Sequence, residues 1–291
     1  MIATRITMMN KIIAYILFVC FISCTASPSY EFLISSDRNG QSDIFLMNEK
    51  ADILKEITSD TTEEWAPVWV DDQQISFLRQ VGSRVEVILK DLESGKESKI
   101  SQPPNCVLED KNFTFLHSLE KRIYACNGNA YYVNAQNRNV TNLTKNLTSN
   151  INYLSWGQSW NELVFTSNHT GNNEVYIYYI GSNSLENISN NASNDERGDL
   201  SPDGKWMVYS SNRFNSNNQD IVVQNLETQE VERITESPGN ELIARWSKDQ
   251  KMIFFGSDKD GNWEIYSYQL ESKETKRLTK NEFFDGDPRL R

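Results

Sequence analysis

The sequence is poor in the residues that most enzymes and metal sites require. Its 291 residues include only two histidines and four cysteines. His117 and His169 have no partner at a ligand or catalytic spacing, which favours two solvated side chains over a metal site or a general base. No GxSxG motif occurs, so the nucleophile elbow of an α/β-hydrolase is excluded. We therefore predict no catalytic residue and no metal ligand.

Long apolar runs and helical periodicity are scarce as well. The one sustained run, residues 12–22, follows Arg5 and Lys11 and is too short to span a bilayer as a stable helix. These proportions are typical of a secretory signal, so we assign residues 1–24 to a signal peptide and expect an exported protein. After it, no stretch shows apolar residues recurring every 3.6 positions, which predicts almost no helix.

The end of the predicted signal offers more than one interpretation. Residues 21–24 read Phe-Ile-Ser-Cys and resemble a bacterial lipobox, in which Cys24 becomes the lipidated first residue of the mature protein. Cleavage after Ala26 would instead release a soluble, secreted protein, and a membrane anchor with Cys24 as an ordinary residue is a third alternative. We expect the lipoprotein, periplasmic or anchored at the outer membrane, with residues 25–29 as a short linker.

The charge balance limits the choice of partner. Removing residues 1–24 leaves 27 Lys and Arg against 40 Asp and Glu, a net charge of −13. Such a surface stays soluble and repels polyanions, so nucleic acid is excluded as a partner. A protein with a basic or neutral surface, or a cation, suits this charge better.

Only Cys106 and Cys126 lie outside the predicted signal. In an oxidising compartment two such cysteines either form a disulfide or remain as two buried free thiols. The Cα separation that a disulfide requires is not readable from the sequence, so both alternatives stay open.

Internal repetition dominates the rest of the chain. Six positions carry Thr or Ser directly after Ile or Leu, at intervals of 43, 43, 45, 46 and 44 residues. They are Thr58, Ser101, Thr144, Ser189, Thr235 and Thr279. A period of this length, with several short strands and turn residues in each unit, is typical of a β-propeller. We predict that residues 30–291 form one all-β domain of six four-stranded antiparallel blades.

Residues 195–213 show the repeat unit most clearly. At its centre residues 201–205 read Ser-Pro-Asp-Gly-Lys, a tight turn in which Pro presets one φ, Asp bonds the backbone ahead and Gly takes the positive φ. Residues 206–210 follow as a strand rich in aromatic and β-branched side chains. Weaker copies of this turn occur at residues 246–251 and 69–73.

The two ends of the chain complement each other. The first unit begins near Tyr30 with its second strand and lacks a first one. Residues 285–291 match the start of a unit, because Pro288 stands nine residues after the preceding closing Thr, as Pro67 does in the second unit. The C-terminal strand should therefore pair into the first blade and close the ring.

The repeat unit resembles the WD-like repeat of TolB and its relatives. Its pattern of acid, Pro, aromatic, Ser-Pro-Asp-Gly-Lys, β run, Asx-Gly turn and closing Leu-Thr is visible in residues 195–213, 241–266, 64–77 and 285–288. The resemblance covers residues 30–291 and implies a TolB-like propeller whose channel face docks an envelope protein. TolB carries a further α/β domain before its propeller, for which this chain has no room, and similar propellers occur in peptidases and sugar lyases.

The repeat also predicts which residues lie at the mouth of the central channel. Six positions after each closing Thr or Ser, the innermost strand begins, at Glu64, Val107, Asn150, Asp195, Glu241 and Asp285. Four of these residues are acids and would form a collar that takes a cation or a basic segment of a partner. Alternatively, each acid bonds the backbone of a neighbouring turn and serves only the scaffold. We select Glu64, Asn150, Asp195, Glu241 and Asp285 as candidate binding residues.

One acidic stretch has the alternating oxygen-bearing side chains of a calcium-binding loop. Asp258, Asp260, Asn262 and Glu264 alternate as such ligands do, but a strand begins where further ligands are needed, which favours a hairpin turn. We predict no cofactor, although the channel would admit a cation.

We therefore predict a monomeric, non-catalytic binding or scaffold protein of the cell envelope that docks a protein partner or a ligand. The alternative is a glycan lyase or hydrolase that uses the collar carboxylates as acid and base. A propeller that senses a small molecule in its channel is the third hypothesis.

Overall fold

The structure is a computed structural model that describes residues 30–103, 105–106, 108, 113–115, 121–134, 139–145, 150–157 and 161–291. The predicted signal, the linker, Cys24, Val107 and His117 lie outside these residues. Within them, every regular element is a strand. A search of the described residues for a helix long and apolar enough to cross a bilayer finds none.

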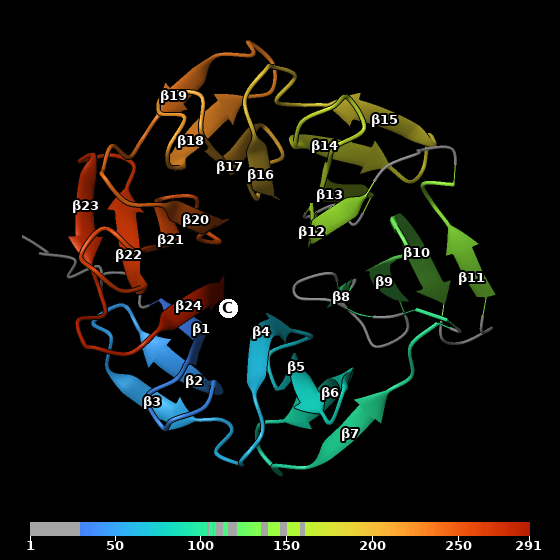
Figure 1. The fold of residues 1–291 in the computed structure, drawn as a ribbon, viewed down its shortest axis with the longest axis vertical. Coiled ribbons are helices and arrows are strands. Elements are labelled where there is room, and N and C mark those ends of the chain that lie inside the picture. The colour runs from blue at the N-terminus through green and yellow to red at the C-terminus, as the bar shows by residue number, and fades with distance from the viewer. Residues whose placement is uncertain are drawn as a thin grey trace, which may run out of the picture.

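The strands form six four-stranded antiparallel sheets arranged radially around an axis, as Figure 1 shows. Blade one contains β24 (Asp285–Leu290), β1 (Glu31–Ser36), β2 (Asp43–Asn48) and β3 (Ile53–Glu56). Blade two contains β4 (Glu64–Trp69), β5 (Gln74–Val81), β6 (Arg84–Asp91) and β7 (Glu97–Ile100). Blade three contains β8 (Phe113–Phe115), β9 (Lys121–Cys126), β10 (Asn129–Asn134) and β11 (Asn139–Asn142).

The second half of the ring repeats the arrangement. Blade four contains β12 (Ile151–Trp156), β13 (Glu162–Ser167), β14 (Glu174–Tyr179) and β15 (Ser184–Asn187). Blade five contains β16 (Asp195–Leu200), β17 (Trp206–Ser211), β18 (Asp220–Asn225) and β19 (Val231–Arg233). Blade six contains β20 (Glu241–Trp246), β21 (Met252–Ser257), β22 (Glu264–Gln269) and β23 (Glu274–Arg277). The predicted six-bladed all-β propeller is confirmed.

The predicted closure of the ring is also confirmed. The last strand, β24, pairs antiparallel with β1, so that Asp285 lies opposite Ser36 and Leu290 opposite Phe32. Blade one is thus built from both ends of the chain, and its innermost strand comes from the C-terminus (Figure 1).

The turn at residues 201–205 forms as its residue types predict. The Ser201 hydroxyl donates to Asp203 Oδ1 over 2.7 Å, and the same hydroxyl accepts the Trp206 backbone N–H over 2.9 Å. Gly204 has a φ of +72°, the left-handed conformation that glycine adopts at little cost. In blade six, Ser247 and Asp249 repeat the hydroxyl-to-carboxylate bond, and Gln250 takes the left-handed conformation.

The closing Thr or Ser of each unit has a structural role. The Thr58 hydroxyl accepts the Ile44 backbone N–H over 2.9 Å and donates to Asp43 Oδ1 over 3.2 Å, which ties the end of the blade to the start of its third strand. The same N–H-to-hydroxyl bond is made in four further blades, by Thr144, Ser189, Thr235 and Thr279.

The hydrophobic core lies between blades rather than within them. Six clusters of buried residues occur in the described chain, one at each junction of neighbouring blades. At the junction of blades five and six, Val208 and Ile221 pack with Phe255 and Tyr266. A blade therefore buries its apolar faces only when both neighbours are present, as repeat architectures require.

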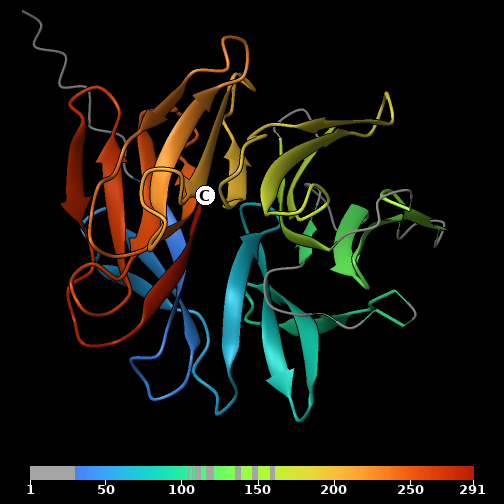
Figure 2. The ribbon, with the colours of Figure 1, turned by 45° about the horizontal axis from the view of Figure 1, so that its top comes forward.

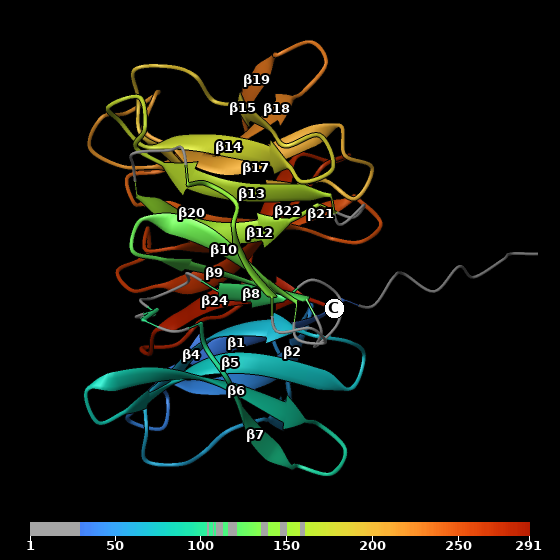
Figure 3. The same cartoon turned by 90° about the vertical axis from the view of Figure 1, so that its right-hand side faces the viewer.

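The ring has two distinct faces. The loop face is formed by residues 37–42, 168–173, 212–219, 258–263 and 280–284, close to the start of the innermost strands. The turn face is formed by the short turns at residues 70–73, 201–205 and 247–251, and the described chain both starts there at Tyr30 and ends there at Arg291. Figure 2 shows the ring tilted, and Figure 3 shows it from the side with the C-terminus on the turn face.

Candidate functional site

The innermost strands line the central channel, and five of them share one irregularity. The pairing register of β4, β12, β16, β20 and β24 shifts after the second residue, which is a β-bulge. The third residue of each strand is not glycine yet has a φ between +51° and +63°, namely Ala66, Tyr153, Arg197, Ile243 and Asp287. Such conformations are uncommon for these residue types, and here they redirect the side chains that follow.

The first residue of the innermost strand carries the predicted acidic collar. Glu64, Asp195, Glu241 and Asp285 occupy that position, and each side chain is fully buried. Three of the carboxylates lie against arginines, with Asp285 2.7 Å from Arg38, Asp195 3.5 Å from Arg213, and Glu64 in contact with Arg79. These three acids therefore lie buried at the start of the innermost strand, where each is paired with an arginine of its own blade.

Asn150 does not belong to this series. In the strand register Ile151 pairs with Ser167 as Asp195 pairs with Ser211, so Ile151 is the equivalent residue. Asn150 is exposed one position earlier and donates its backbone N–H to Asn168 Oδ1 over 3.2 Å. The spacing of six residues fails here because the connection before blade four contains one more residue than the connections before blades one, two, five and six.

The basic partner follows the same repeat. In blades one and five the arginine that pairs with the acid is Arg38 and Arg213, respectively. Each lies two residues after the residue that is paired with the acid across the two strands. In blade four the equivalent residue is His169, which faces a strand that begins with Ile151 instead of an acid. In blade four the acid and the arginine are thus replaced together, as expected for a structural ion pair.

Glu241 is the exception among the buried acids. The equivalent basic residue, Lys259, lies over the Tyr266 ring at 4.1 Å instead of pairing with Glu241. Neither carboxylate oxygen of Glu241 accepts a hydrogen bond of good geometry from the described residues. Burial raises the pKa of Glu241, the Ser237 and Thr235 hydroxyls and the charge of Lys259 lower it in part, and the nearby Asp220 raises it again. Burial likewise raises the pKa of Glu64 and Asp43.

The channel itself is lined by different residues, and several of them are basic. A cavity of about 20 Å³ at its centre is bordered by Arg197 of β16, Arg245 of β20, and Asp287 and Arg289 of β24. Arg245 is only 6% exposed. Burial, and secondly repulsion from Arg289, lowers the pKa of the Arg245 guanidinium to about 9. The channel of this acidic protein therefore concentrates positive charge.

These channel arginines are not among the binding residues predicted from the sequence. Arg197 is the third residue of its strand, and Arg245 and Arg289 are the fifth residues of theirs. The signal available in the sequence was the recurrence of an arginine four residues after the collar acid in Arg245 and Arg289; Arg197 had no such signal. Their orientation toward the axis depends on the bulge, which no residue pattern announced.

The acidic stretch at residues 258–264 is occupied by internal contacts. Asp260 contacts the Tyr266 hydroxyl and lies 2.9 Å from Arg277, which also lies 2.9 Å from Glu264. Asp258 Oδ1 accepts the Asn240 backbone N–H over 2.6 Å. No group of three or more His, Cys, Asp or Glu side chains that would suit a metal ion occurs in the part of the chain that the structure describes.

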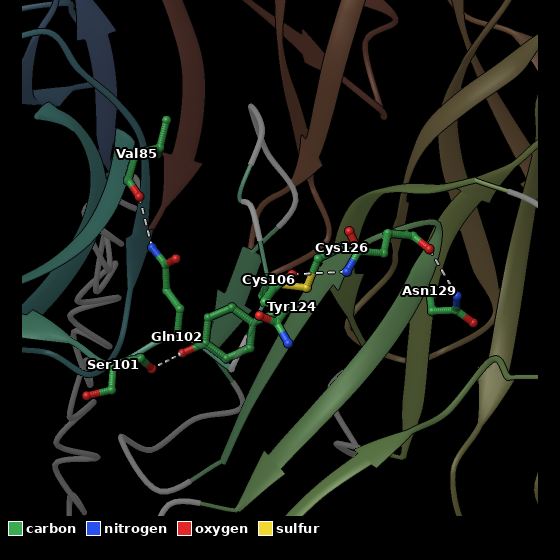
Figure 4. Close-up of a disulfide and its surroundings, with 9 residues drawn as sticks. Val85, Ser101, Gln102, Cys106, Tyr124, Cys126 and Asn129 are labelled. Atoms are coloured by element: carbon green, nitrogen blue, oxygen red, sulfur yellow. Dashed lines mark hydrogen bonds between the residues drawn. A yellow bond between two sulfur atoms is a disulfide. The ribbon is translucent and has the colours of Figure 1, made fainter. Parts of the chain in front are cut away.

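Cys106 and Cys126 are joined by a disulfide in blade three, shown in Figure 4. Their Cα atoms lie 5.3 Å apart, within the range that a disulfide accepts. Both cysteines are buried in the cluster between blades two and three, next to Tyr124. The Tyr124 hydroxyl donates to the Ser101 carbonyl over 3.0 Å, so this cluster also holds the connection between the two blades (Figure 4).

Breaking this disulfide is expected to destabilise the propeller. The cysteines are 20 residues apart, and releasing a loop of this length costs about 3 kcal/mol. Cys126→Ser or reduction should lower the thermal midpoint accordingly, while intact protein should show the two-dalton mass deficit of one disulfide by mass spectrometry without reduction. An equal midpoint with and without reductant would show that the bond does not contribute.

Comparisons with known proteins agree with this architecture. No family model matches the chain. The Tol-Pal system protein TolB of Francisella tularensis subsp. tularensis (strain WY96-3418) is 29% identical over 119 residues, which cover 41% of this chain and 27% of the relative. The match thus spans about a quarter of the length of that relative.

Two solved structures share the fold over most of this chain. TolB from Acinetobacter baumannii superposes with a TM-score of 0.77 at 17% identity, over 90% of this chain and 66% of that one. A putative TolB from Agrobacterium tumefaciens superposes with a TM-score of 0.67 at 14% identity, over 88% of each chain. Together with the closed ring of six four-stranded blades, these findings show that the protein is a TolB-like six-bladed β-propeller.

Proposed function

We propose that this protein is a non-catalytic binding protein of the cell envelope and docks a protein partner on the loop face of its propeller, around the channel mouth. The observation that carries the proposal is the TolB-like propeller, since the curated relative that the chain matches in part is a Tol-Pal system protein. A protein of that kind of system is the class of partner to test first.

The loop face has the features of a protein-binding surface. Phe214, Phe283 and Phe284 lie in its loops and are 46%, 36% and 37% exposed. Exposed aromatic side chains are frequent hot spots of protein interfaces, because they bury a large apolar area when a partner docks. The exposed acids Glu236 and Asp60 near these loops are each paired with an arginine, at 3.2 Å. The net negative charge of the chain, 40 Asp and Glu against 29 Lys and Arg, supports a partner with a basic or neutral surface.

The position of the N-terminal end agrees with docking on this face. Tyr30 lies on the turn face, where its hydroxyl donates to Asp249 over 2.9 Å. If Cys24 carries a lipid, only residues 25–29 separate it from Tyr30, and the extended chain between these two residues reaches about 20 Å. The turn face then lies toward the membrane and the loop face points away from it. Labelled palmitate incorporated by the wild type and lost in Cys24→Ser tests this anchor.

The glycan lyase or hydrolase alternative has no support from the predicted carboxylates. Asp195 and Glu241, the residues expected to act as acid and base, are fully buried. A general acid or base must come within hydrogen-bond reach of the substrate, and a fully buried carboxylate does not.

A binding experiment with matched variants tests the proposed docking face. Phe214→Ala combined with Phe283→Ala should weaken capture of the partner from an envelope fraction, and then the affinity of the purified pair, by roughly tenfold or more. Trp206→Ala is the control, because Trp206 is 37% exposed but lies at the start of β17 on the turn face. Weakened binding by the control, with full binding by the loop-face variant, would contradict the proposal.

A further inference from the structure

A pocket on the turn face opens between blades five and six. Strands β17, β18 and β19 border it on one side, and β20, β22 and the turns that follow these two strands border it on the other (Figure 1). Its volume is about 160 Å³. A cavity of about 150 Å³ accommodates one six-membered ring, so this pocket has room for one ring of a ligand.

The wall of the pocket is aromatic. Trp206 of β17 is 37% exposed, whereas Trp246 of β20 and Tyr268 of β22 are 8% and 5% exposed. The Trp246 indole N–H donates to the Asp199 carbonyl over 3.1 Å, so the single donor of this side chain is already used. Trp246 therefore offers only apolar surface to the pocket. An aromatic face is electron-rich and attracts the weakly positive hydrogens of C–H groups.

The rim of the pocket is polar but carries no net charge. Lys273 Nζ lies 2.7 Å from Glu232 Oε1, and this ion pair connects blade six to blade five. One such bond leaves the other ammonium hydrogens and most lone pairs of the carboxylate available to a ligand. The Tyr268 hydroxyl lies near both charges, because burial and secondly Glu232 raise the pKa of this hydroxyl while Lys273 lowers it. It stays protonated at neutral pH and is able both to donate and to accept.

The repeat itself does not require an aromatic residue at the Trp206 position, the first residue of the second strand. The equivalent residues of four other blades are Glu31, Gln74, Glu162 and Met252. A pocket of about 170 Å³ occupies the equivalent place between blades four and five, where Glu162 and Leu200 replace Trp206 and Trp246. Because the same fold forms that pocket without a tryptophan, the packing of the blades does not explain the partly exposed indole of Trp206.

We propose that the pocket between blades five and six binds one pyranose ring of a neutral glycan. A sugar ring has an apolar C–H face and a polar hydroxyl edge, which match the aromatic wall and the uncharged rim. The C–H face packs against Trp206, and the hydroxyl groups bond to Glu232, Lys273 and the Tyr268 hydroxyl. An apolar side chain would cover the polar rim without bonding to it, which is unfavourable. An ion would compete with one partner of the Glu232–Lys273 pair.

Titration of the protein with three neutral trisaccharides tests the site. Cellotriose, maltotriose and triacetylchitotriose are the probes, and isothermal titration calorimetry measures the affinity. At least one probe should bind with a dissociation constant of about 1 mM or lower, as expected for a small ligand in an open pocket. That probe should also shift the nuclear magnetic resonance signal of the Trp206 indole N–H, which is identified by its absence in Trp206→Phe.

Variants at the two ends of the pocket locate the binding. Trp206→Ala should weaken binding by roughly tenfold, because it removes the surface on which the sugar packs. Glu162→Ala is the matched control at the equivalent position of the neighbouring pocket, and it should bind as the wild type does. Glu232→Ala changes a side chain that is 59% exposed and should weaken binding severalfold, which keeps the test decisive if Trp206→Ala does not fold.

Several outcomes would overturn the proposal. They are the absence of binding by all three probes, an unchanged affinity in Trp206→Ala or Glu232→Ala, an equal loss in Glu162→Ala, and tighter binding of decaproline than of every trisaccharide. The site does not depend on the proposed docking function, so Phe214→Ala combined with Phe283→Ala should leave sugar binding unchanged.

Discussion

Deletion of residues 285–291 is expected to abolish the cooperative folding of the whole propeller. These residues form β24, the innermost strand of blade one, and its pairing covers β1, whose residues Phe32, Leu33 and Ile34 are fully buried. The deletion also removes the ion pair of 2.7 Å between Arg38 and Asp285. We expect a loss of more than about 5 kcal/mol, which is comparable with the total stability of many domains.

Thermal unfolding followed by circular dichroism measures this effect. The matched control is a chain that ends at Leu290 and lacks only Arg291, whose side chain is 39% exposed and pairs with Glu31 at the surface. That control should lose less than about 1 kcal/mol. A deletion variant that melts at the wild-type temperature would show that the ring does not need its C-terminal strand.

Glu241→Gln is expected to stabilise the protein at neutral pH, although it changes a fully buried residue. The carboxylate of Glu241 accepts no hydrogen bond of good geometry in the described chain, and Asp220 repels it. Replacing a buried, poorly satisfied charge with a neutral amide of the same shape should raise the free energy of unfolding by about 1 to 3 kcal/mol. The equivalent change in blade one, Asp285→Asn, breaks an ion pair and should cost about 2 kcal/mol.

The pH dependence supplies an independent check on Glu241. Its pKa is raised in the folded state, so on acidification the folded state binds a proton before the unfolded state does. The contribution of Glu241 to stability therefore grows as the pH falls from neutral through the raised pKa toward its ordinary value. The difference in unfolding free energy between Glu241→Gln and wild type, measured by chemical denaturation, should shrink over that range. A difference that stays constant with pH would contradict the raised pKa.

The fold was predictable because it depends on short-range sequence signals that recur along the chain. The Ser-Pro-Asp-Gly-Lys turn at residues 201–205, the closing Thr residues and the match between the two chain ends are each recognisable without a structure. Each acts through contacts close in sequence or through regular strand pairing, as the hydroxyls of Ser201 and Thr58 show.

The candidate site was predicted less well, because it depends on geometry that residue types do not report. Strand alternation would direct residues one, three and five of an innermost strand to the same side. The bulge in β20 interrupts that alternation, so that Glu241 is fully buried at the start of the strand while Arg245 borders the channel. The extra residue before blade four similarly shifted the predicted collar from Ile151 to Asn150.

Residue order alone was enough to specify the number of blades, the hairpin turns and the use of the C-terminus as the first strand, since these follow from repeat spacing and short-range hydrogen bonds. Only the assembled ring decided which charges are buried, which are paired and which border the axis. The reason is physical: burial and pairing depend on residues about 44 positions apart that become neighbours when the blades pack, and on bulges that reorient side chains at the centre.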